Sequence, residues 1–189
     1  MDPLSITLGI LGLIVTVLLA LIPYFRKVYF IGPELTIELI PDGGLSMNRG
    51  LSGKNDTSKG YVDGNKAIYV FEVTWKVNLK ITNNSNITAY YPKLNYLNQQ
   101  LSFTRLDKLD INTPIQGNEQ ILLKGTYVMY EEVNGKERTQ TNELPSNFDD
   151  LKILLEYKNT HKKSFYTVYS NSNETEKNKY TRKKPKEFK

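Results

Sequence analysis

The side chains that commonly perform chemistry are few in this 189-residue sequence, and they are not grouped. Cysteine is absent, which excludes a thiol nucleophile, a thiolate metal site and a disulfide bond. One histidine, His161, cannot form a zinc triad, and a Ser-His-Asp site would need all its geometry around that exposed residue. Glu131 and Glu132 are adjacent, and neighbours on a strand point to opposite faces. We therefore expect no catalytic residue, no metal site, no cofactor and no enzymatic activity.

The segment 41–66 carries six glycines and several cations. Backbone N–H groups of glycine-rich loops can cradle phosphate, which makes Arg49, Lys54 and Lys59 the candidate ligand-binding residues. The segment lacks both the G-x-x-x-x-G-K-[ST] and the G-x-G-x-x-G motif, and aspartates nearly balance its cations. Connections longer than about 12 to 15 residues are usually functional or disordered. We therefore expect a disordered or strand-connecting loop here in preference to a phosphate site.

These polar groups follow a long apolar stretch, residues 4–25, which contains no charged residue. Twenty-two helical residues rise about 33 Å, enough to cross a hydrocarbon core of about 30 Å. Tyr24 and Phe25 end the stretch, where aromatic rings favour the headgroup layer, and Arg26 and Lys27 follow directly. The pattern predicts one transmembrane helix in the lipid bilayer, with these four residues at the membrane interface.

A cleaved signal peptide is the alternative for the same stretch. Signal peptides combine a positive start, an apolar run of about 7 to 15 residues and a small-residue cleavage site. Here Asp2 precedes the run, the run is longer, and no A-x-A pattern follows it. The sequence therefore favours a retained anchor.

The distribution of charge around the span predicts its orientation, because Lys and Arg near a span tend to stay in the cytoplasm. Only Asp2 and the terminal amine precede the span, and cations follow it. We expect a single-pass protein of the inner (cell) membrane, with the N-terminus outside and residues 26–189 in the cytoplasm. Four Asn-x-Ser/Thr sequences match the glycosylation pattern and point the other way, although an Asn- and Thr-rich chain produces such matches by chance.

Small and weakly polar residues recur along the apolar stretch at steps of three and four, which keeps them on one face of a helix. This face consists of Asp2, Ser5, Gly9, Gly12, Thr16, Ala20 and Pro23. In lipid, small residues let helices approach closely, and hydroxyls can bond across the contact. The face predicts a helix–helix seam in a homo-oligomer or the lining of a pore. Alternatively, such residues are simply common in membrane spans, and the proline merely ends the helix.

The remainder of the chain predicts an all-β domain. Residues 68–82 alternate strictly between apolar and polar side chains, as in a strand with one face on a core and one face in water. Trp75 falls on the apolar face. Residues 34–40, 120–133, 151–157 and 164–170 carry further strand patterns, and turn residues separate them. We expect an antiparallel β-sandwich or small barrel, immunoglobulin-like, preceded by one transmembrane helix.

The predicted boundaries are a transmembrane anchor and interfacial flank over residues 1–30, a cytoplasmic all-β domain over 31–170 and a basic flexible tail over 171–189. The tail contributes +4 of the net charge of +5. Such a tail can bind anionic lipid or nucleic acid, or it can be an unstructured solubilising segment. No duplex-DNA partner is expected.

In layout the chain resembles small membrane effectors of bacterial antiviral nucleotide-signalling systems, namely the minimal-β-barrel effectors of CBASS and the channel-like effector of Hailong. The features that carry the resemblance are the N-terminal span Leu4–Phe25, the basic pair Arg26-Lys27 and the single all-β domain. The resemblance implies a nucleotide or oligonucleotide second messenger as ligand, a homo-oligomer, and growth arrest of an infected cell by a pore or membrane disruption. The alternative function is a passive, membrane-tethered immunoglobulin-like interaction module, either cytoplasmic or facing the envelope.

Overall fold

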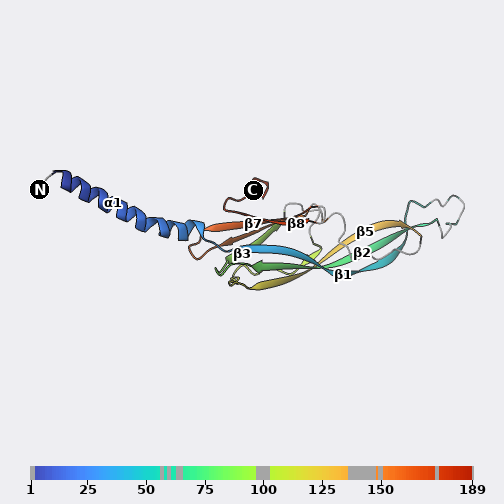
Figure 1. Cartoon of the computed structure of the whole chain (residues 1–189). Helices are drawn as coiled ribbons and strands as arrows, with labels where there is room; N and C mark the ends of the chain where they lie inside the picture. The colour runs from blue at the N-terminus through green and yellow to red at the C-terminus, as the bar shows by residue number, and fades with distance from the viewer. Residues whose placement is uncertain are drawn as a thin grey trace.

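The structure, a computed structural model, describes residues 3–55, 58, 61–62, 66–96, 103–135, 148, 151–172 and 175–188. Helix α1 (Pro3–Phe25) projects from one end of an elongated molecule and continues into a π-helical turn, η1 (Arg26–Phe30) (Figure 1). The stretch Ile10–Phe30 is long and apolar enough to cross a membrane, a property that signal sequences share. Its large apolar side chains between Ile10 and Phe25 are exposed.

After the helix the chain forms two antiparallel four-stranded sheets, here called sheet A and sheet B. Sheet A has the order β1-β2-β5-β4 and sheet B the order β3-β6-β7-β8. The strands of sheet A are β1 (Leu35–Leu51), β2 (Ile68–Asn83), β4 (Arg105–Leu106) and β5 (Gln120–Asn134). The strands of sheet B are β3 (Tyr90–Tyr96), β6 (Lys152–Lys158), β7 (Ser164–Ser172) and β8 (Thr175–Thr181), and a short 3-10 turn, η4 (Lys186–Phe188), follows. The predicted all-β, sandwich-like fold with one N-terminal apolar helix is confirmed.

One hydrophobic cluster contains side chains from the inner faces of both sheets. On β2 the alternate residues from Phe71 to Ile81 are buried, as the sequence alternation predicts, because period-two side chains share one face of a strand. Trp75 packs on Tyr127 with ring centroids 6.0 Å apart, and Tyr127 meets Phe148 edge to face at 5.1 Å. The single tryptophan is therefore a core residue, as expected.

Sheet A is longer than sheet B and continues past it as a three-stranded extension (Figure 1). We call this extension the arm, and it comprises residues 43–51 of β1, 68–75 of β2 and 127–134 of β5. The pairing reaches Leu51 opposite Tyr69 and Ile68 opposite Asn134. The arm thus lies at the opposite end of the molecule from the helix.

The prediction of a loop over residues 41–66 is wrong for its first part, because β1 continues to Leu51. The glycines that suggested a loop instead occupy irregular positions of the strand. Gly43 and Gly50 adopt φ of 79° and 116°, and the β1–β2 register shifts beside each of them. Glycine adopts these angles without strain, so the strand bulges and continues.

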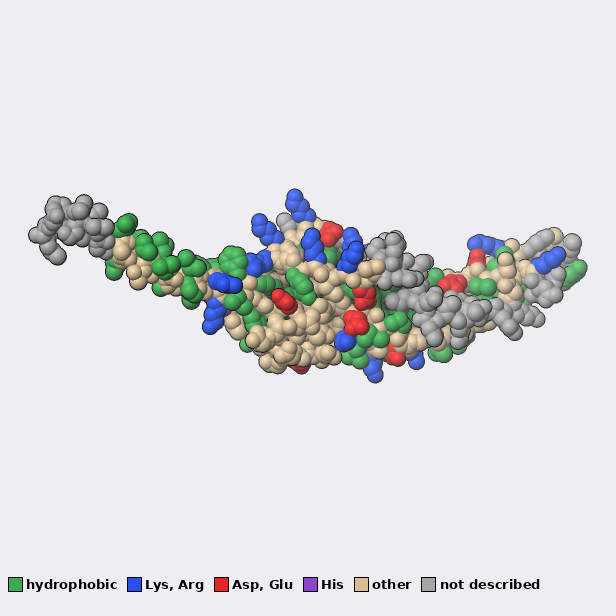
Figure 2. All heavy atoms as spheres, in the orientation of Figure 1, with side chains coloured by type: hydrophobic (Ala, Val, Ile, Leu, Met, Phe, Trp, Pro, Cys, Tyr) green, Lys and Arg blue, Asp and Glu red, His purple; other side chains and the backbone are tan. Residues whose placement is uncertain are grey.

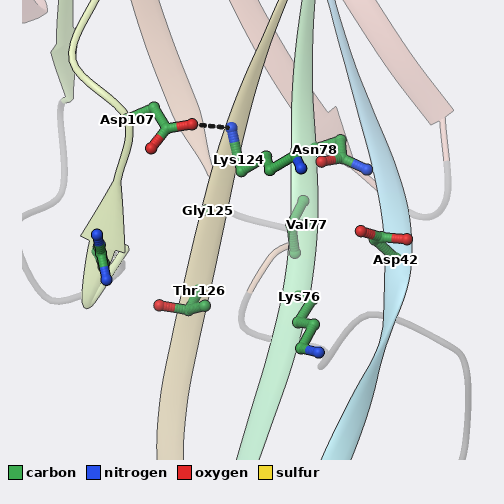
Figure 3. A pocket seen from close by; sticks show the side chains of 9 residues that line it. Asp42, Lys76, Val77, Asn78, Asp107, Lys124, Gly125 and Thr126 are labelled. Carbon is green, nitrogen blue, oxygen red and sulfur yellow. Dashed lines mark hydrogen bonds between the residues drawn. The ribbon is translucent and has the colours of Figure 1, made fainter.

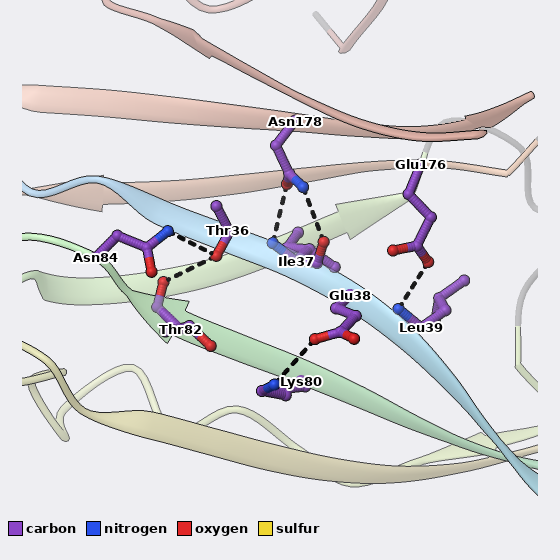
Figure 4. A network of polar contacts seen from close by, with 9 residues as sticks. All are labelled: Thr36, Ile37, Glu38, Leu39, Lys80, Thr82, Asn84, Glu176 and Asn178. Atoms are coloured by element: carbon purple, nitrogen blue, oxygen red, sulfur yellow. Dashed lines mark hydrogen bonds and ion pairs between the residues drawn. The ribbon is translucent and has the colours of Figure 1, made fainter.

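The prediction of a flexible tail over residues 171–189 is also corrected, since β8 pairs with β7 along its whole length. Two polar side chains of β8 reach the backbone of β1, the edge strand of sheet A (Figure 4). Asn178 accepts a hydrogen bond from the Ile37 N–H at 2.9 Å and donates one to the Ile37 carbonyl at 2.9 Å. The Glu176 carboxylate accepts one from the Leu39 N–H at 3.0 Å. The polar side chains that suggested disorder therefore join β8 of sheet B to the edge of sheet A by hydrogen bonds.

Candidate functional site

The junction between helix and sandwich is fixed by side chains from sheet B. Asn159, at the end of β6, is 2 % exposed and donates to the carbonyls of Val28 and Ile31 at 3.2 and 3.3 Å. Its side-chain oxygen accepts the backbone N–H of His161 and Lys163, both at 3.0 Å. One asparagine thus orders the β6–β7 turn and binds the last turn of the helix at the same time.

Two cations complete this junction by contacting aromatic rings of η1. Lys163 lies over the ring of Tyr29 and Arg182 over the ring of Phe30, each 4.6 Å from the ring centre. The Arg182 guanidinium also donates to the Phe30 carbonyl at 2.9 Å. Figure 2 shows Lys and Arg side chains gathered where the helix meets the sandwich. The orientation of the helix relative to the sandwich is therefore set by hydrogen bonds and cation–π contacts instead of by a free linker.

The predicted membrane-interface residues lie at the end of α1 and the start of η1. Tyr24 and Phe25 are exposed, with ring centroids 6.1 Å apart, and Phe25 stacks on Tyr29 at 6.0 Å. Arg26 and Lys27 are exposed on the π-helical turn. Two exposed aromatic residues and two exposed basic residues therefore follow one another at the base of the helix.

The predicted helix–helix seam lies on α1, except for Asp2, which is outside the described residues. Ser5 and Gly9 belong to the first half of α1, and Gly12, Thr16, Ala20 and Pro23 follow. The Thr16 hydroxyl donates to the Gly12 carbonyl at 2.8 Å, and the space beside Gly12 is open. Pro23 lies inside the helix and does not end it. Self-association along this face stays a prediction.

A hollow of about 390 Å³ lies on the outer face of sheet A (Figure 3). It crosses β1, β2, β5 and β4 in turn, and its lining includes three cations and two carboxylates. The cations are Lys76, Arg105 and Lys124, and the carboxylates are Asp42 and Asp107. We call this hollow the sheet A groove.

The strand register places the residues that line the groove next to one another. Lys76 of β2 is opposite Thr126 of β5, and Arg105 of β4 is opposite the same threonine. Asp107 is held just after β4, because its backbone N–H donates to the Lys124 carbonyl at 2.9 Å and its carboxylate accepts the Lys124 N–H at 3.0 Å. The Asp107 carboxylate thus accepts a hydrogen bond from the backbone. The three cationic side chains of the groove therefore outnumber its other carboxylate, that of Asp42.

Gly125 allows the short strand β4 to pack closely against β5 at this edge. A Cβ at Gly125 would meet Leu106 at 3.0 Å and Phe103 at 3.1 Å, so glycine allows both side chains to pack against β5. Arg105 therefore lies beside the outward residues of β5. Chemically, the groove can bind a small anion through Lys and Arg donors, and its openness to water keeps each interaction modest.

The sequence did not indicate these three cations as a site. Lys76 was expected on the wet face of a strand, and Lys124 and Arg105 had no assigned role. The available signal was the outward position of lysines on two strands, but their proximity depends on the β2–β5 register, which sequence pattern alone does not fix.

The candidate ligand-binding cations of the glycine-rich segment lie elsewhere. Arg49 forms a salt bridge with Glu72 at 2.6 Å, and Lys54 pairs with Glu132. Lys59 is outside the described residues. Hydrogen bonds from Arg49 and, to a smaller extent, from Tyr130 lower the pKa of Glu72. The Glu72 carboxylate therefore stays charged and neutralises Arg49. The structure thus does not bring Arg49 and Lys54 together as an anion site.

Within the part of the chain that the structure describes, no three His, Asp or Glu side chains are grouped so that they could hold a metal ion. His161 lies in the exposed turn that joins β6 to β7. Comparison with protein-family models, with curated proteins and with solved structures found no match to this chain.

Proposed function

We propose that the chain is a membrane-anchored effector in antiviral defence, whose α1 crosses the inner membrane and whose cytoplasmic β-sandwich senses a nucleotide-type signal. Binding of this signal changes how the helices of several copies assemble, and the assembly forms a pore or disrupts the bilayer. The observation that carries the proposal is the fixed junction, in which Asn159 and Arg182 bind backbone carbonyls at the base of the helix. A rigid joint transmits a rearrangement of one part to the other, whereas a passive tether works equally well with a flexible linker.

The sheet A groove is the proposed ligand site. Lys76, Arg105 and Lys124 supply donors for phosphate oxygens, and the groove volume of about 390 Å³ suits a small ligand. Ligand binding shifts an equilibrium only if the two assembled states bind it differently. Because β1 crosses the groove at Asp42 and follows the helix directly, the ligand contacts an element that is continuous with the membrane anchor.

A passive interaction module is the second candidate, and a property of the arm favours it. Leu45, Met47, Leu51 and Tyr130 are each more than half exposed there. Leu45, Met47 and Tyr130 share one face of sheet A, because each is in register with Thr74 or Glu72 of β2, whereas Leu51 is in register with Tyr69. Exposed apolar side chains gathered on one face are typical of protein-binding surfaces. In this version, cytoplasmic or facing the envelope, the arm holds a partner protein and the helix only anchors it.

The two functions are separated by making the junction flexible. A Gly-Ser-Gly-Ser insertion between Ile31 and Gly32 interrupts the rigid joint, and the same insertion between Tyr61 and Val62 is the matched control. Both proteins are expressed in bacteria, and carbonate-resistant membrane association and entry of a membrane-impermeant dye are measured. We expect the junction insertion to retain membrane association and abolish dye entry, while the control preserves both. A wild-type protein that is monomeric and admits no dye would favour the passive module.

The helix seam is tested in the same assay. Gly12→Leu and Thr16→Leu together add bulk to the predicted contact face, and Ile14→Val changes volume on the opposite face of the helix. Small residues permit close helix packing, so we expect only the double variant to lose cross-linked oligomers and dye entry. Unchanged oligomers in that variant would contradict this seam.

A further inference from the structure

A cavity of about 370 Å³ lies beside the junction, between the segment that follows η1 and strands β6 to β8. Half of its ten lining residues are aromatic. The aromatic residues are Phe30, Tyr157, Phe165, Tyr166 and Tyr180. The lining also contains one carboxylate, Glu34, and one guanidinium, Arg182. Aromatic faces attract ammonium groups, and arginine binds phosphate, so the lining complements a molecule that carries both groups.

The walls of this cavity are firmly positioned. Tyr157 is 1 % exposed, and its hydroxyl accepts the Leu35 N–H at 3.5 Å and shares a hydrogen bond with Thr167 at 3.1 Å. The rings of Tyr157 and Phe165 stack at 6.3 Å. A Cβ at residue 32 would lie 2.4 Å from the Phe165 ring, so only glycine fits there. The site is therefore preformed, which lowers the cost of ordering it on binding.

Glu34 lines the cavity together with the two tyrosines Tyr157 and Tyr180. Burial raises the pKa of both Tyr157 and Tyr180, and the negative charge of Glu34 raises each pKa further. A carboxylate that acts on two cavity hydroxyls also acts on a cation placed between them. Arg182 is held at the other side of the lining by its bond to the Phe30 carbonyl.

The distance of the cavity from the apolar part of the helix indicates where its ligand comes from. If α1 crosses the bilayer, as proposed above, Tyr24 and Phe25 mark the edge of the hydrocarbon core. Phe30 comes five residues later, a rise of about 7 Å, and the headgroup layer on each side of a bilayer is about 5 to 7 Å thick. Phe30 and the cavity wall beside it therefore lie at headgroup level.

We propose that this junction cavity binds the headgroup of a zwitterionic aminophospholipid, with the ammonium group between Tyr180 and Glu34 and with the phosphate on Arg182. The inference rests on the proposed membrane insertion of α1. A bound headgroup contacts η1, β7 and β8 at once, so it would brace the joint between the anchor and the sandwich.

The test uses the full chain purified in detergent. Retention of phosphatidylethanolamine and of phosphatidylglycerol, which lacks the ammonium group, is compared by native mass spectrometry. We expect phosphatidylethanolamine to be retained about tenfold more strongly, and Glu34→Gln to remove this preference, since the variant loses the ammonium's counter-charge. Glu38→Gln is the matched control, because Glu38 lies four residues after Glu34, on β1, and pairs with Lys80 at 3.0 Å outside the cavity.

A second variant guards against a purely structural effect. Tyr180→Leu removes an aromatic wall at a position that is 44 % exposed, and Tyr61→Leu changes an exposed tyrosine elsewhere. Only the first should weaken phosphatidylethanolamine retention. Equal retention of the two lipids by the wild type, or a preference that persists in both Glu34→Gln and Tyr180→Leu, would overturn the inference.

Two further measurements separate the sources of the ligand and the proposals. Soluble O-phosphoethanolamine is titrated calorimetrically, and tighter binding of this compound than of the lipid would overturn the lipid assignment. Carbonate extraction of membranes tests the anchor independently. Release of the protein by carbonate would contradict the proposed function, whereas an anchored protein without headgroup preference would contradict only the cavity inference.

Discussion

The two ends of the molecule are held together by different kinds of contact. At the junction, buried side chains such as Asn159 bind backbone groups of a distant segment, so the helix base and the sandwich form one unit. At the arm, three strands pair with one another, and exposed ion pairs such as Arg49–Glu72 link their side chains. Exposed ion pairs stabilise little, whereas buried hydrogen bonds are costly to lose. Buried side chains therefore hold the backbone at the base of the helix, whereas the side-chain ion pairs across the arm are exposed and weak.

The largest expected effect contrasts the sandwich core with the arm. Leu155 is fully buried, and Leu45 is 63 % exposed. Leu155→Ala should lower the free energy of unfolding by about 2 to 5 kcal/mol, because it leaves a cavity in the core. Leu45→Ala should change it by no more than about 0.5 kcal/mol. Denaturant titration followed by Trp75 fluorescence measures both, and equal losses would abolish the distinction between the regions.

The next effect concerns the junction itself. Asn159→Ala leaves the carbonyls of Val28 and Ile31 without this donor, and we expect a loss of about 1 to 3 kcal/mol because the bond to Val28 is buried and the bond to Ile31 is partly buried. Thr160→Ala, at the exposed neighbouring position, is the control. Spin labels on Leu18 and Lys177 should report a broader distance distribution only in the first variant. An unchanged distribution would mean that Asn159 does not hold the helix in place.

A smaller effect is expected at the seam between β8 and β1. Asn178→Ala removes both bonds to Ile37, and since water can reach this edge, the loss should be about 1 kcal/mol. Hydrogen exchange at the Ile37 amide should accelerate at the same time. Lys179→Ala, on the next residue of β8, should leave both quantities unchanged. Slow exchange at Ile37 in the Asn178 variant would contradict the assigned role of this asparagine.

The smallest effect is the pH response of the arm. Hydrogen bonds from Arg49 and Tyr130 lower the pKa of Glu72 below its usual 4.5. A lowered folded-state pKa contributes stability above the unfolded value, and this contribution is lost as the pH falls through the folded-state pKa. Backbone relaxation by NMR should therefore show the arm loosening below about pH 4.5 while the junction stays ordered. Glu72→Gln should remove this response, and a persistent response would assign it to another group.

Sequence pattern predicted the parts of the fold that follow from local periodicity. The apolar run of α1 and the alternation along β2 each specify an element and its buried face, and Trp75 lies where the alternation put it. The errors arose where a residue type has two structural uses. Gly43 and Gly50 fall in the predicted loop but lie at bulges of β1, and Glu176 and Asn178 fall in the predicted flexible tail but bind a strand edge.

The candidate sites depend on contacts that no local pattern encodes. Lys76 and Lys124 are 48 positions apart in sequence terms and become neighbours only through the β2–β5 register. The junction cavity joins Phe30 and Glu34 to residues near position 180, and its chemistry appears only after the chain has folded. Sequence analysis therefore predicted the apolar helix but not the sites that flank it.

The bonds between β8 and β1 also have a consequence for synthesis. Ile37 and Asn178 are 141 positions apart, so β1 leaves the ribosome long before the side chains that cover its edge have been made. Until then β1 has an unprotected edge, and nascent strands of neighbouring chains can pair with it. A holdase that covers β1 during this interval would therefore raise the yield of folded protein.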